Sequence, residues 1–197
     1  MKNCVLASNN RKKIAELRAI LESLNIRVHP QSEWDITDAE ETGTTFIENA
    51  IIKARHAARI SGLAAIADDS GICVPALAGA PGVYSARYAG EPSDDGANNA
   101  KLLRELSNQS DRSAYYVCAI VYLRHADDPL PLIAQGLWHG EVLKKACGEG
   151  GFGYDPLFYL PDLGCSAAEL ASDDKNRISH RAQALEQLAT LLANEHS

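Results

Sequence analysis

Short apolar runs alternate with longer stretches of helical spacing in the first part of the chain. Residues 4–7 are apolar and are followed by the polar residues 8–10, after which apolar side chains recur three and four positions apart over residues 14–24. A second short run covers residues 26–28, and a second helical stripe covers residues 46–58. Short apolar runs are typical of strands, and apolar residues at helical spacing are typical of amphipathic helices. The pattern therefore predicts strand, helix, strand and helix in that order.

The second predicted helix carries signals at both ends. Thr44 or Thr45 can cap its first turn, because a hydroxyl accepts a backbone N–H that the helix leaves unpaired. Ser61 and Gly62 end it, since glycine readily adopts the left-handed conformation that often follows a helix. An acidic loop over residues 33–41 precedes this helix.

The rest of the chain continues the alternation. Strands are predicted over residues 63–66, 72–74 and 157–160, and a long hairpin over 114–123 and 132–142. Helices are predicted over residues 94–107 and 178–192, and turns or loops over 79–82, 127–129 and 148–153. No repeat or linker interrupts the chain, so we expect residues 1–197 to form a single domain of the α/β class. Its architecture would be a mixed central sheet flanked by helices, with two lobes and an active-site cleft between them.

Composition narrows the class of protein. At 197 residues, 46% hydrophobic and 23% charged, the chain is long enough for a substantial core. No window approaches the roughly 20 apolar residues that cross a bilayer, and Arg11, Lys12 and Lys13 interrupt the apolar start. We therefore expect a cytoplasmic protein with no membrane segment. The five cysteines include no C-x-x-C pair, which predicts reduced thiols, mostly in the core, and neither a disulfide framework nor a zinc site.

The net charge of −7 disfavours a nucleic-acid surface, because binding to a phosphate backbone requires a basic footprint. A bound polyphosphate would need a local basic pocket and the help of a metal ion. Clustered acids and individual lysines are therefore the residues to locate.

Two adjacent carboxylates, Asp68 and Asp69, follow the predicted strand 63–66 and precede Ser70 and Gly71. Crowded carboxylates repel each other unless a cation or a lysine neutralises them, and Mg²⁺ is the simplest such partner. Ligands of α/β folds gather at the carboxyl ends of strands, where residues 8–10 and 68–70 both fall. The alternative is an ordinary acidic turn, because Asp, Ser and Gly are also frequent turn and helix-cap residues.

Two further groups of residues could bind an anionic ligand. Residues 8–13 lie between a strand and a helix, where free N–H groups and the helix dipole favour anions; the alternative is an ordinary helix start with solvated lysines. Lys53 shares a stripe with Asn49 on a helix rich in apolar residues, so it points either into a cleft or out to solvent. Glu40 and Glu41 precede that helix, where the dipole alone favours acids.

The glycine-rich loop and the last predicted helix carry groups that could recognise a flat ring. Glycines allow close backbone approach, and Phe152 or Tyr154 could stack on a heterocycle. A tight loop with two core aromatics is the simpler interpretation. Lys175 and residues 179–181, Ser-His-Arg, add donors that could bind a heterocycle or a phosphate.

Together these motifs resemble the inosine/xanthosine triphosphate pyrophosphatase family over residues 3–192. The matching segments are SNNRKK (8–13), EETGTTFIENA (40–50), ADDSG (67–71), GAPGVYSAR (79–87), GGFGYDP (150–156) and SHR (179–181). The resemblance implies hydrolysis of the non-canonical purine nucleoside triphosphates ITP, dITP and XTP to the monophosphate and pyrophosphate with Mg²⁺, which keeps deaminated bases out of DNA and RNA. It also implies a homodimer, for which residues 79–87 are a candidate interface.

The resemblance implies residue roles as well. Asp69 would be general base and metal ligand, and Glu40 the second metal ligand, although the sequence leaves open whether Glu40 or Glu41 contacts the metal. Asp68, Glu41 and Lys53 would complete the catalytic set. The implied substrate-binding residues are Ser8, Asn9, Asn10, Lys13, Ser70, Phe152, Gly153, Tyr154, Asp155, Lys175, His180 and Arg181. A fixed donor such as Arg181 would favour inosine and xanthosine, whose rings present a carbonyl where adenine presents an amino group.

Two other functions remain open from the sequence. A less selective nucleotide pyrophosphatase would share the chemistry, but the chain lacks the R-E-x-x-E-E helix of Nudix-like enzymes. A non-catalytic purine nucleotide-binding sensor would gain little from the Asp68 and Asp69 pair, because added negative charge repels phosphates.

Overall fold

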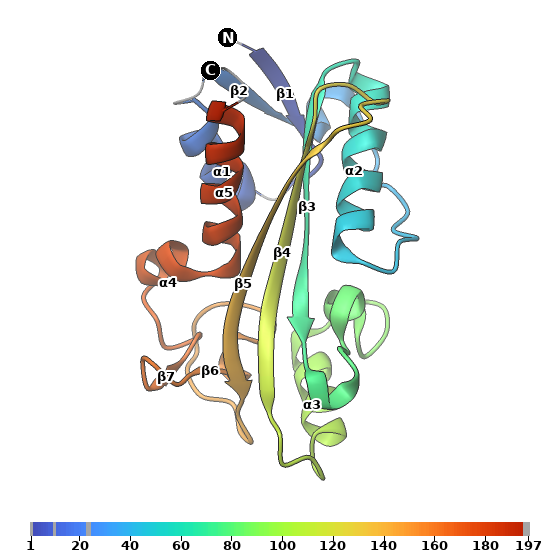
Figure 1. Ribbon diagram of the computed structural model, residues 1–197. Coiled ribbons are helices and arrows are strands. Elements are labelled where there is room, and N and C mark those ends of the chain that lie inside the picture. The colour runs from blue at the N-terminus through green and yellow to red at the C-terminus, as the bar shows by residue number, and fades with distance from the viewer. Residues whose placement is uncertain (1, 10, 23–24, 195–197) are drawn as a thin grey trace. The chain divides into compact units, whose positions relative to one another are not determined.

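The computed structural model describes residues 2–9, 11–22 and 25–194, and its contacts divide the chain into two compact units. Unit 1 comprises Met1–Asp69, Cys118–Gln135 and Gln183–Ser197; unit 2 comprises Ser70–Val117 and Gly136–Ala182. Within the described residues, a seven-stranded sheet with the order β2-β1-β3-β4-β5-β6-β7 contains parallel and antiparallel pairs (Figure 1). The predicted α/β class with a mixed sheet and flanking helices is confirmed. The single domain and the cleft between two lobes stay predictions.

Unit 1 holds the strand, helix, strand and helix that the sequence predicts. β1 (Lys2–Leu6) lies between β2 (Ile26–Pro30) and β3 (Ala64–Cys73) and is parallel to both. The helix α1 (Arg11–Glu22) joins β1 to β2, and the 3-10 turn η1 (Gln31–Trp34) follows β2. The helix α2 (Phe46–Ser61) then leads into β3.

Successive side chains of a strand point to opposite faces, and each face of the sheet in unit 1 has its own core. Leu6 and Ile66 belong to a cluster with side chains of α1 and α5 (His180–Asn194). Val5 and Ala67 belong to a second cluster with alanines of α2. Figure 1 shows α2 on one side of these strands and α1 and α5 on the other.

Both ends of α2 lie where the local signals predict. The Thr45 hydroxyl accepts the Glu48 N–H at 3.2 Å, and the Glu48 carboxylate accepts the Thr45 N–H at 2.9 Å, which forms a capping box. Gly62 follows the last turn with a φ of 69°. The predicted cap and stop are confirmed.

β3 corrects a sequence prediction. The sequence predicts two strands, over residues 63–66 and 72–74, separated by the carboxylate pair, but Ala64–Cys73 is one continuous strand with Asp68 and Asp69 in its interior. The separation into two strands and the alternative of an ordinary acidic turn are both wrong, because pairing and burial in the sheet outweigh the low strand preference of Asp and Gly. Pairing with β1 nevertheless ends at Leu6↔Ile66. Both carboxylates therefore lie just beyond the carboxyl end of the parallel part of the sheet.

Unit 2 contains the shorter elements. They are η2 (Pro75–Leu77), η3 (Gly82–Arg87), α3 (Asp95–Glu105), η4 (Asp155–Leu157), β6 (Phe158–Leu160), β7 (Cys165–Ser166) and α4 (Ser172–Ile178). β4 (Ser113–Leu123) and β5 (Leu132–Val142) are neighbours in the sheet, as the predicted hairpin requires. The core of unit 2 is built around Ile72, Leu102, Trp138 and Phe158.

The last helix begins later than its apolar spacing predicts. Ile178 ends α4, and 37% of it is exposed. Ser179 has an extended backbone, and its hydroxyl accepts the Ala182 N–H at 3.3 Å, so α5 begins at His180. The prediction of one helix over residues 178–192 is wrong at its start, because this serine breaks the helix and caps the next.

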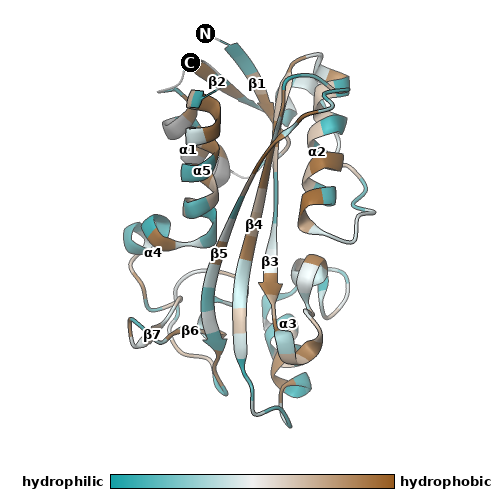
Figure 2. Cartoon of the chain, viewed as in Figure 1, coloured by the Kyte–Doolittle hydropathy of each residue, from teal (hydrophilic) through white to brown (hydrophobic). Residues whose placement is uncertain are grey.

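Figure 2 shows apolar residues along the central strands, while α4 is mostly polar. In the described part of the chain, no helix is long and apolar enough to cross a membrane. All five cysteines are free thiols; Cys4, Cys73 and Cys118 are buried, and Cys147 is exposed. The prediction that the cysteines lie mostly in the core is confirmed.

Candidate active site

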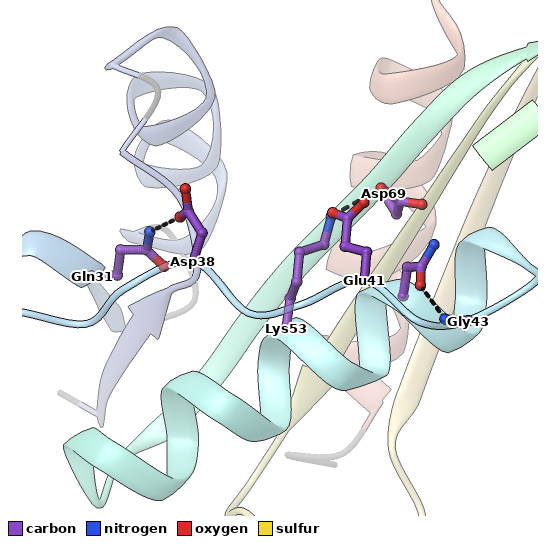
Figure 3. Close-up of polar contacts among 7 residues, drawn as sticks. Gln31, Asp38, Glu41, Gly43, Lys53 and Asp69 are labelled. Carbon is purple, nitrogen blue, oxygen red and sulfur yellow. Dashed lines mark hydrogen bonds and ion pairs between the residues drawn. The ribbon is translucent and has the colours of Figure 1, made fainter. Parts of the chain in front are cut away.

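Asp69 faces α2 because of the alternation of side chains along β3. Ala65 and Ala67 contact α2, so Asp69 is directed to the same face and Asp68 to the opposite one. Nζ of Lys53, on α2, lies 2.9 Å from Oδ1 of Asp69 (Figure 3). A lysine therefore neutralises one of the two carboxylates.

Lys53 also binds Glu41, with Nζ 2.7 Å from Oε1. Only 16% of the Lys53 side chain is exposed, so it points at the two carboxylates and not out to solvent. Burial alone would lower the pKa of Lys53, but the carboxylates of Asp69 and Glu41 outweigh burial and raise that pKa above its ordinary value. The ammonium group is thus held protonated between two acids.

The carboxyl group of Asp69 is unusually basic. Burial raises the pKa of Asp69, Lys53 offsets part of this rise, and the nearby charges of Glu41 and Asp68 raise the pKa further. Oδ2 of Asp69 is buried and has no hydrogen-bond partner among the described residues. Since buried polar atoms are normally paired, this oxygen is available to a ligand, a metal ion or a water molecule.

Glu40 and Glu41 have different surroundings. Glu41 is only 24% exposed at its side chain and binds Lys53. Glu40 is exposed, and within the described residues no hydrogen bond or ion pair engages its carboxylate. Glu40 is therefore the glutamate with a carboxylate left for another cation.

Two carboxylates of unit 1 could hold a metal ion that is shared with a phosphate ligand. No group of three or more His, Cys, Asp and Glu side chains within the described residues is arranged to hold a metal ion. Mg²⁺ does not require such a group, because it keeps several waters and is usually held by one or two carboxylates together with substrate phosphates. The unpartnered Oδ2 of Asp69 and the carboxylate of Glu40 could form such a pair.

The predicted phosphate loop follows β1, the parallel strand next to β3. Ser8 is half-buried and its N–H donates to the Leu6 carbonyl at 2.8 Å, whereas Asn9 is exposed. Asn10 lies outside the described residues. Lys13 belongs to α1, and its side chain lies outside the described part of the structure.

In unit 2, Asp155 joins several of the predicted base-recognition residues. Its side chain is buried, Oδ2 accepts the Phe152 N–H at 2.8 Å and the Lys175 ammonium, and Oδ1 lies 3.5 Å from the Tyr116 hydroxyl. Gly151 has a φ of +76°, and a Cβ there would lie 2.2 Å from Oδ2 of Asp155. Only glycine allows the loop to wrap this closely around the carboxylate.

Phe152 is exposed although its backbone is fixed. Phe152 is 61% exposed, and Nζ of Lys175 lies 4.4 Å from the centroid of its ring. The next residue, Gly153, is held by α3 on both sides: its N–H donates to Asp95 at 2.7 Å, and its carbonyl accepts from Asn99 at 2.9 Å. An exposed aromatic ring on a fixed backbone is suited to stacking on a planar ligand.

Tyr154 and His180 are buried in unit 2. The Tyr154 hydroxyl donates to the Ser85 carbonyl at 2.7 Å, and its ring is part of the apolar core, so its side chain supports the loop. The His180 ring stacks on Tyr116 at 4.8 Å between centroids, with 9° between the planes. Arg181 follows His180 in the first turn of α5 and is half-buried, as is Ser70 in β3.

The sequence interpretation missed the residues that hold these loops. Asp95 and Asn99 of α3, Ser85 of η3 and Tyr116 of β4 each contact a predicted site residue. The only sequence feature that points to Asn99 is a pair of adjacent polar residues in an otherwise amphipathic helix. Ser85 and Tyr116 look like ordinary core positions in the sequence.

The fold and these residues define an α/β protein with a lysine-bridged acidic cluster in unit 1 and a loop cluster around Asp155 in unit 2. The chain belongs to the Ham1 family, whose model matches residues 4–191. It is 60% identical over 195 residues to a dITP/XTP pyrophosphatase of Ralstonia nicotianae, covering 98% of this chain and 97% of that protein. It is 54% identical over 197 residues to a dITP/XTP pyrophosphatase of Nitrosomonas europaea, covering 100% of this chain and 97% of that protein.

Solved structures also align with this chain over nearly its whole length. A HAM1 protein from Coxiella burnetii aligns with a TM-score of 0.96 and 51% identity, covering 98% of this chain and 100% of that one. A protein from Mycobacterium abscessus, described as a nucleoside-triphosphatase / dITP/XTP pyrophosphatase, aligns with a TM-score of 0.81 and 39% identity, covering 96% and 99%. The family predicted from the motifs is confirmed.

Proposed function

We propose that the chain hydrolyses the non-canonical purine nucleoside triphosphates ITP, dITP and XTP to the monophosphate and pyrophosphate. The observation that carries this proposal is the Lys53 ammonium held between Glu41 and Asp69, beside a buried oxygen of Asp69 that has no partner among the described residues. Attack of water on the α-phosphorus requires a base and neutralisation of charge, and this cluster supplies both. The relatives named dITP/XTP pyrophosphatase support the substrate class.

Asp69 is the general base in this proposal. A raised pKa makes a carboxylate a better proton acceptor near neutral pH, and Oδ2 is the atom available to the attacking water. Lys53 keeps Asp69 ionised, and Glu41 holds the Lys53 ammonium in place. Asp68, on the opposite face of β3, supports the geometry of the strand.

Asp69 and Glu40 would hold Mg²⁺ together with phosphate oxygens of the substrate. When bound, the ion neutralises phosphate charge and lowers the pKa of a coordinated water. Glu41 is assigned to Lys53 and not to the metal, because its Oε1 already accepts the ammonium group.

The triphosphate would be bound by residues that follow the two parallel strands. The start of α1 favours anions through its free N–H groups and its dipole. The residues assigned to this role are Ser8, Asn9, Asn10, Lys13 and Ser70.

Base recognition is assigned to unit 2. Phe152 would stack on the purine, while Gly153, Tyr154, Asp155 and Lys175 fix the loop that carries it. His180 and Arg181 would donate to the ring carbonyls of hypoxanthine and xanthine. Adenine presents an amino group at the same position, so two donors would face each other. Guanine shares the carbonyl, and its rejection requires a second contact at position 2.

We further propose a cytoplasmic homodimer with no nucleic-acid partner. The net charge of −7 supports the last point. Residues 79–87 are the proposed interface, where Tyr84 is 57% exposed and lies against Arg87. Exposed aromatic and arginine side chains are enriched at protein interfaces.

Product analysis in ¹⁸O-labelled water tests the reaction. With dITP and Mg²⁺ we expect labelled dIMP and unlabelled pyrophosphate, because water attacks the α-phosphorus. Formation of dIDP and phosphate would contradict this position of attack. Tight binding of dITP without any product would instead identify a nucleotide-binding sensor.

A further inference from the structure

Asn49 links the start of α2 to the loop that carries Glu41. It lies in the first turns of α2 and is 1% exposed. Its Oδ1 accepts the N–H of Gly43 at 2.8 Å. Figure 3 shows Gly43 on the same loop segment as Glu41, beside the start of α2. The Asn49 side chain therefore holds the loop at Gly43, two residues after Glu41.

Glycine is required at position 43 because the loop backbone passes very close to α2. A Cβ at this position would lie 2.6 Å from Cβ of Glu48 and 2.7 Å from Oδ1 of Asn49, distances that ordinary Cβ atoms do not adopt. Its φ does not lie in the left-handed region, so the constraint is one of space. The loop and the helix thus meet at a contact that only glycine and a short polar side chain can form.

The other half of the Asn49 amide has no partner. Nδ2 is buried and forms no hydrogen bond within the described residues. A buried donor without an acceptor costs about 1–3 kcal/mol, so its retention requires an explanation. Asn49 lies one helical turn before Lys53, on the same face of α2.

The acceptors of the Lys53 cluster do not pair with Nδ2 of Asn49. Oε1 of Glu41 and Oδ1 of Asp69 are engaged by Lys53. Oδ2 of Asp69 has no hydrogen-bond partner either, so these two unpaired atoms do not bond each other. A buried donor that lies one helical turn from a lysine on the same helix face is suited to an anionic oxygen.

We propose that Asn49 is a phosphate-binding and positioning residue of the active site. Oδ1 holds the Glu41 loop through Gly43, and Nδ2 donates to a phosphate oxygen of the nucleotide. This inference rests on the proposed pyrophosphatase function, because it names a further contact of the same site.

Asn49→Asp separates the two roles. The carboxylate still accepts the Gly43 N–H but replaces the donor by a negative oxygen. We expect the KM for dITP to rise about tenfold or more, and inorganic triphosphate to bind about tenfold more weakly in calorimetry. If Asn49→Asp does not fold, Asn49→Ala is measured with the same expectation. An unchanged KM and unchanged triphosphate binding would overturn the inference, and would leave a trapped water as the partner of Nδ2.

Two further variants complete the test. Gly43→Ala pushes the loop away from α2, so kcat should fall because Glu41 no longer holds Lys53. Glu48→Ala is the matched control: it removes the capping carboxylate next to Asn49, and should lower thermal stability without changing KM. A KM that rises equally in Glu48→Ala would overturn the specific role of Asn49. Absence of pyrophosphate release by the unmodified protein would instead overturn the proposed function itself.

Discussion

Nζ of Lys53 lies 2.9 Å from Oδ1 of Asp69, and each residue shifts the pKa of the other. The lysine comes from a helix and the aspartate from the strand that follows it, 16 positions later. Most of both side chains is buried, so the interaction is only weakly screened by solvent. The pair sets the protonation of the proposed general base.

Replacing Lys53 by Met should shift the pH dependence of turnover. The ammonium group lowers the pKa of Asp69 against the effect of burial, so its loss raises that pKa further. The acid limb of the pH profile of kcat/KM should therefore move to higher pH. We expect kcat to fall about 100-fold or more, because a fixed positive charge at the reacting centre is lost. An acid limb at the same pH in both proteins would contradict control of Asp69 by Lys53.

Asp69→Asn should abolish turnover and increase stability at neutral pH. The folded-state pKa of Asp69 is raised above its ordinary 3.8, so the ionised form destabilises the folded state at pH values above the folded pKa. This penalty disappears as the pH falls from the folded pKa toward 3.8. Thermal unfolding without added metal should show a higher midpoint for the variant at pH 7, by about 2–4 °C for each kcal/mol, and converging midpoints on acidification.

Asp127→Asn is the control for the stability measurement, because the Asp127 side chain is 89% exposed. It should leave the midpoint unchanged at both pH values. Equal stability of Asp69→Asn and the unmodified protein at pH 7 would contradict the raised pKa. Pyrophosphate release by Asp69→Asn at the parent rate would contradict its role as base.

Local signals predicted the ends of α2, while the continuity of β3 required the sheet. Thr45 and Gly62 act through their own backbone neighbours, so their roles can be read from a few adjacent residues. Asp68 and Asp69 have low strand preference, and only pairing with distant strands makes them part of one. Lys53 contacts Asp69 because successive side chains of β3 point to opposite faces of the sheet. A strand that is buried on both faces shows no alternation of apolar and polar residues, so its sequence does not indicate which side chains share a face.

Glu40→Gln and Glu41→Gln should lower activity for different reasons. Loss of a metal ligand in Glu40→Gln should raise the Mg²⁺ concentration needed for half-maximal activity by about tenfold or more. Glu41→Gln should lower kcat at saturating Mg²⁺, because the Lys53 ammonium loses a charged partner. Magnesium titrations of both variants make the comparison. If only Glu41→Gln changed the Mg²⁺ requirement, the assignment of the two glutamates would be reversed.

Arg181→Ala should weaken the discrimination between bases. We expect the ratio of kcat/KM for ITP to that for ATP to fall about tenfold or more, since a donor to the ring carbonyl is lost. Arg177→Ala is the matched control, because this exposed arginine pairs with Asp174 on α4. Steady-state kinetics with both nucleotides provide the ratio. A ratio that is unchanged in Arg181→Ala would remove Arg181 from base recognition.

The contacts that fix the loop in unit 2 could not be predicted from the sequence. The motif around Phe152 and Asp155 marked the loop, but the residues that fix it, Asp95 and Asn99, lie more than 50 positions away. No local periodicity encodes such a contact. The break at Ser179 was hidden for a different reason: apolar spacing continues across it, while the serine both ends α4 and caps α5.

Pyrophosphate release from ITP, XTP, GTP and ATP, each with and without Mg²⁺, tests the proposed function most directly. We expect rapid release from ITP and XTP with Mg²⁺, release from GTP and ATP that is slower by about 100-fold or more, and little release from any nucleotide without the metal. Equal rates on all four nucleotides would contradict selective hydrolysis of non-canonical purines.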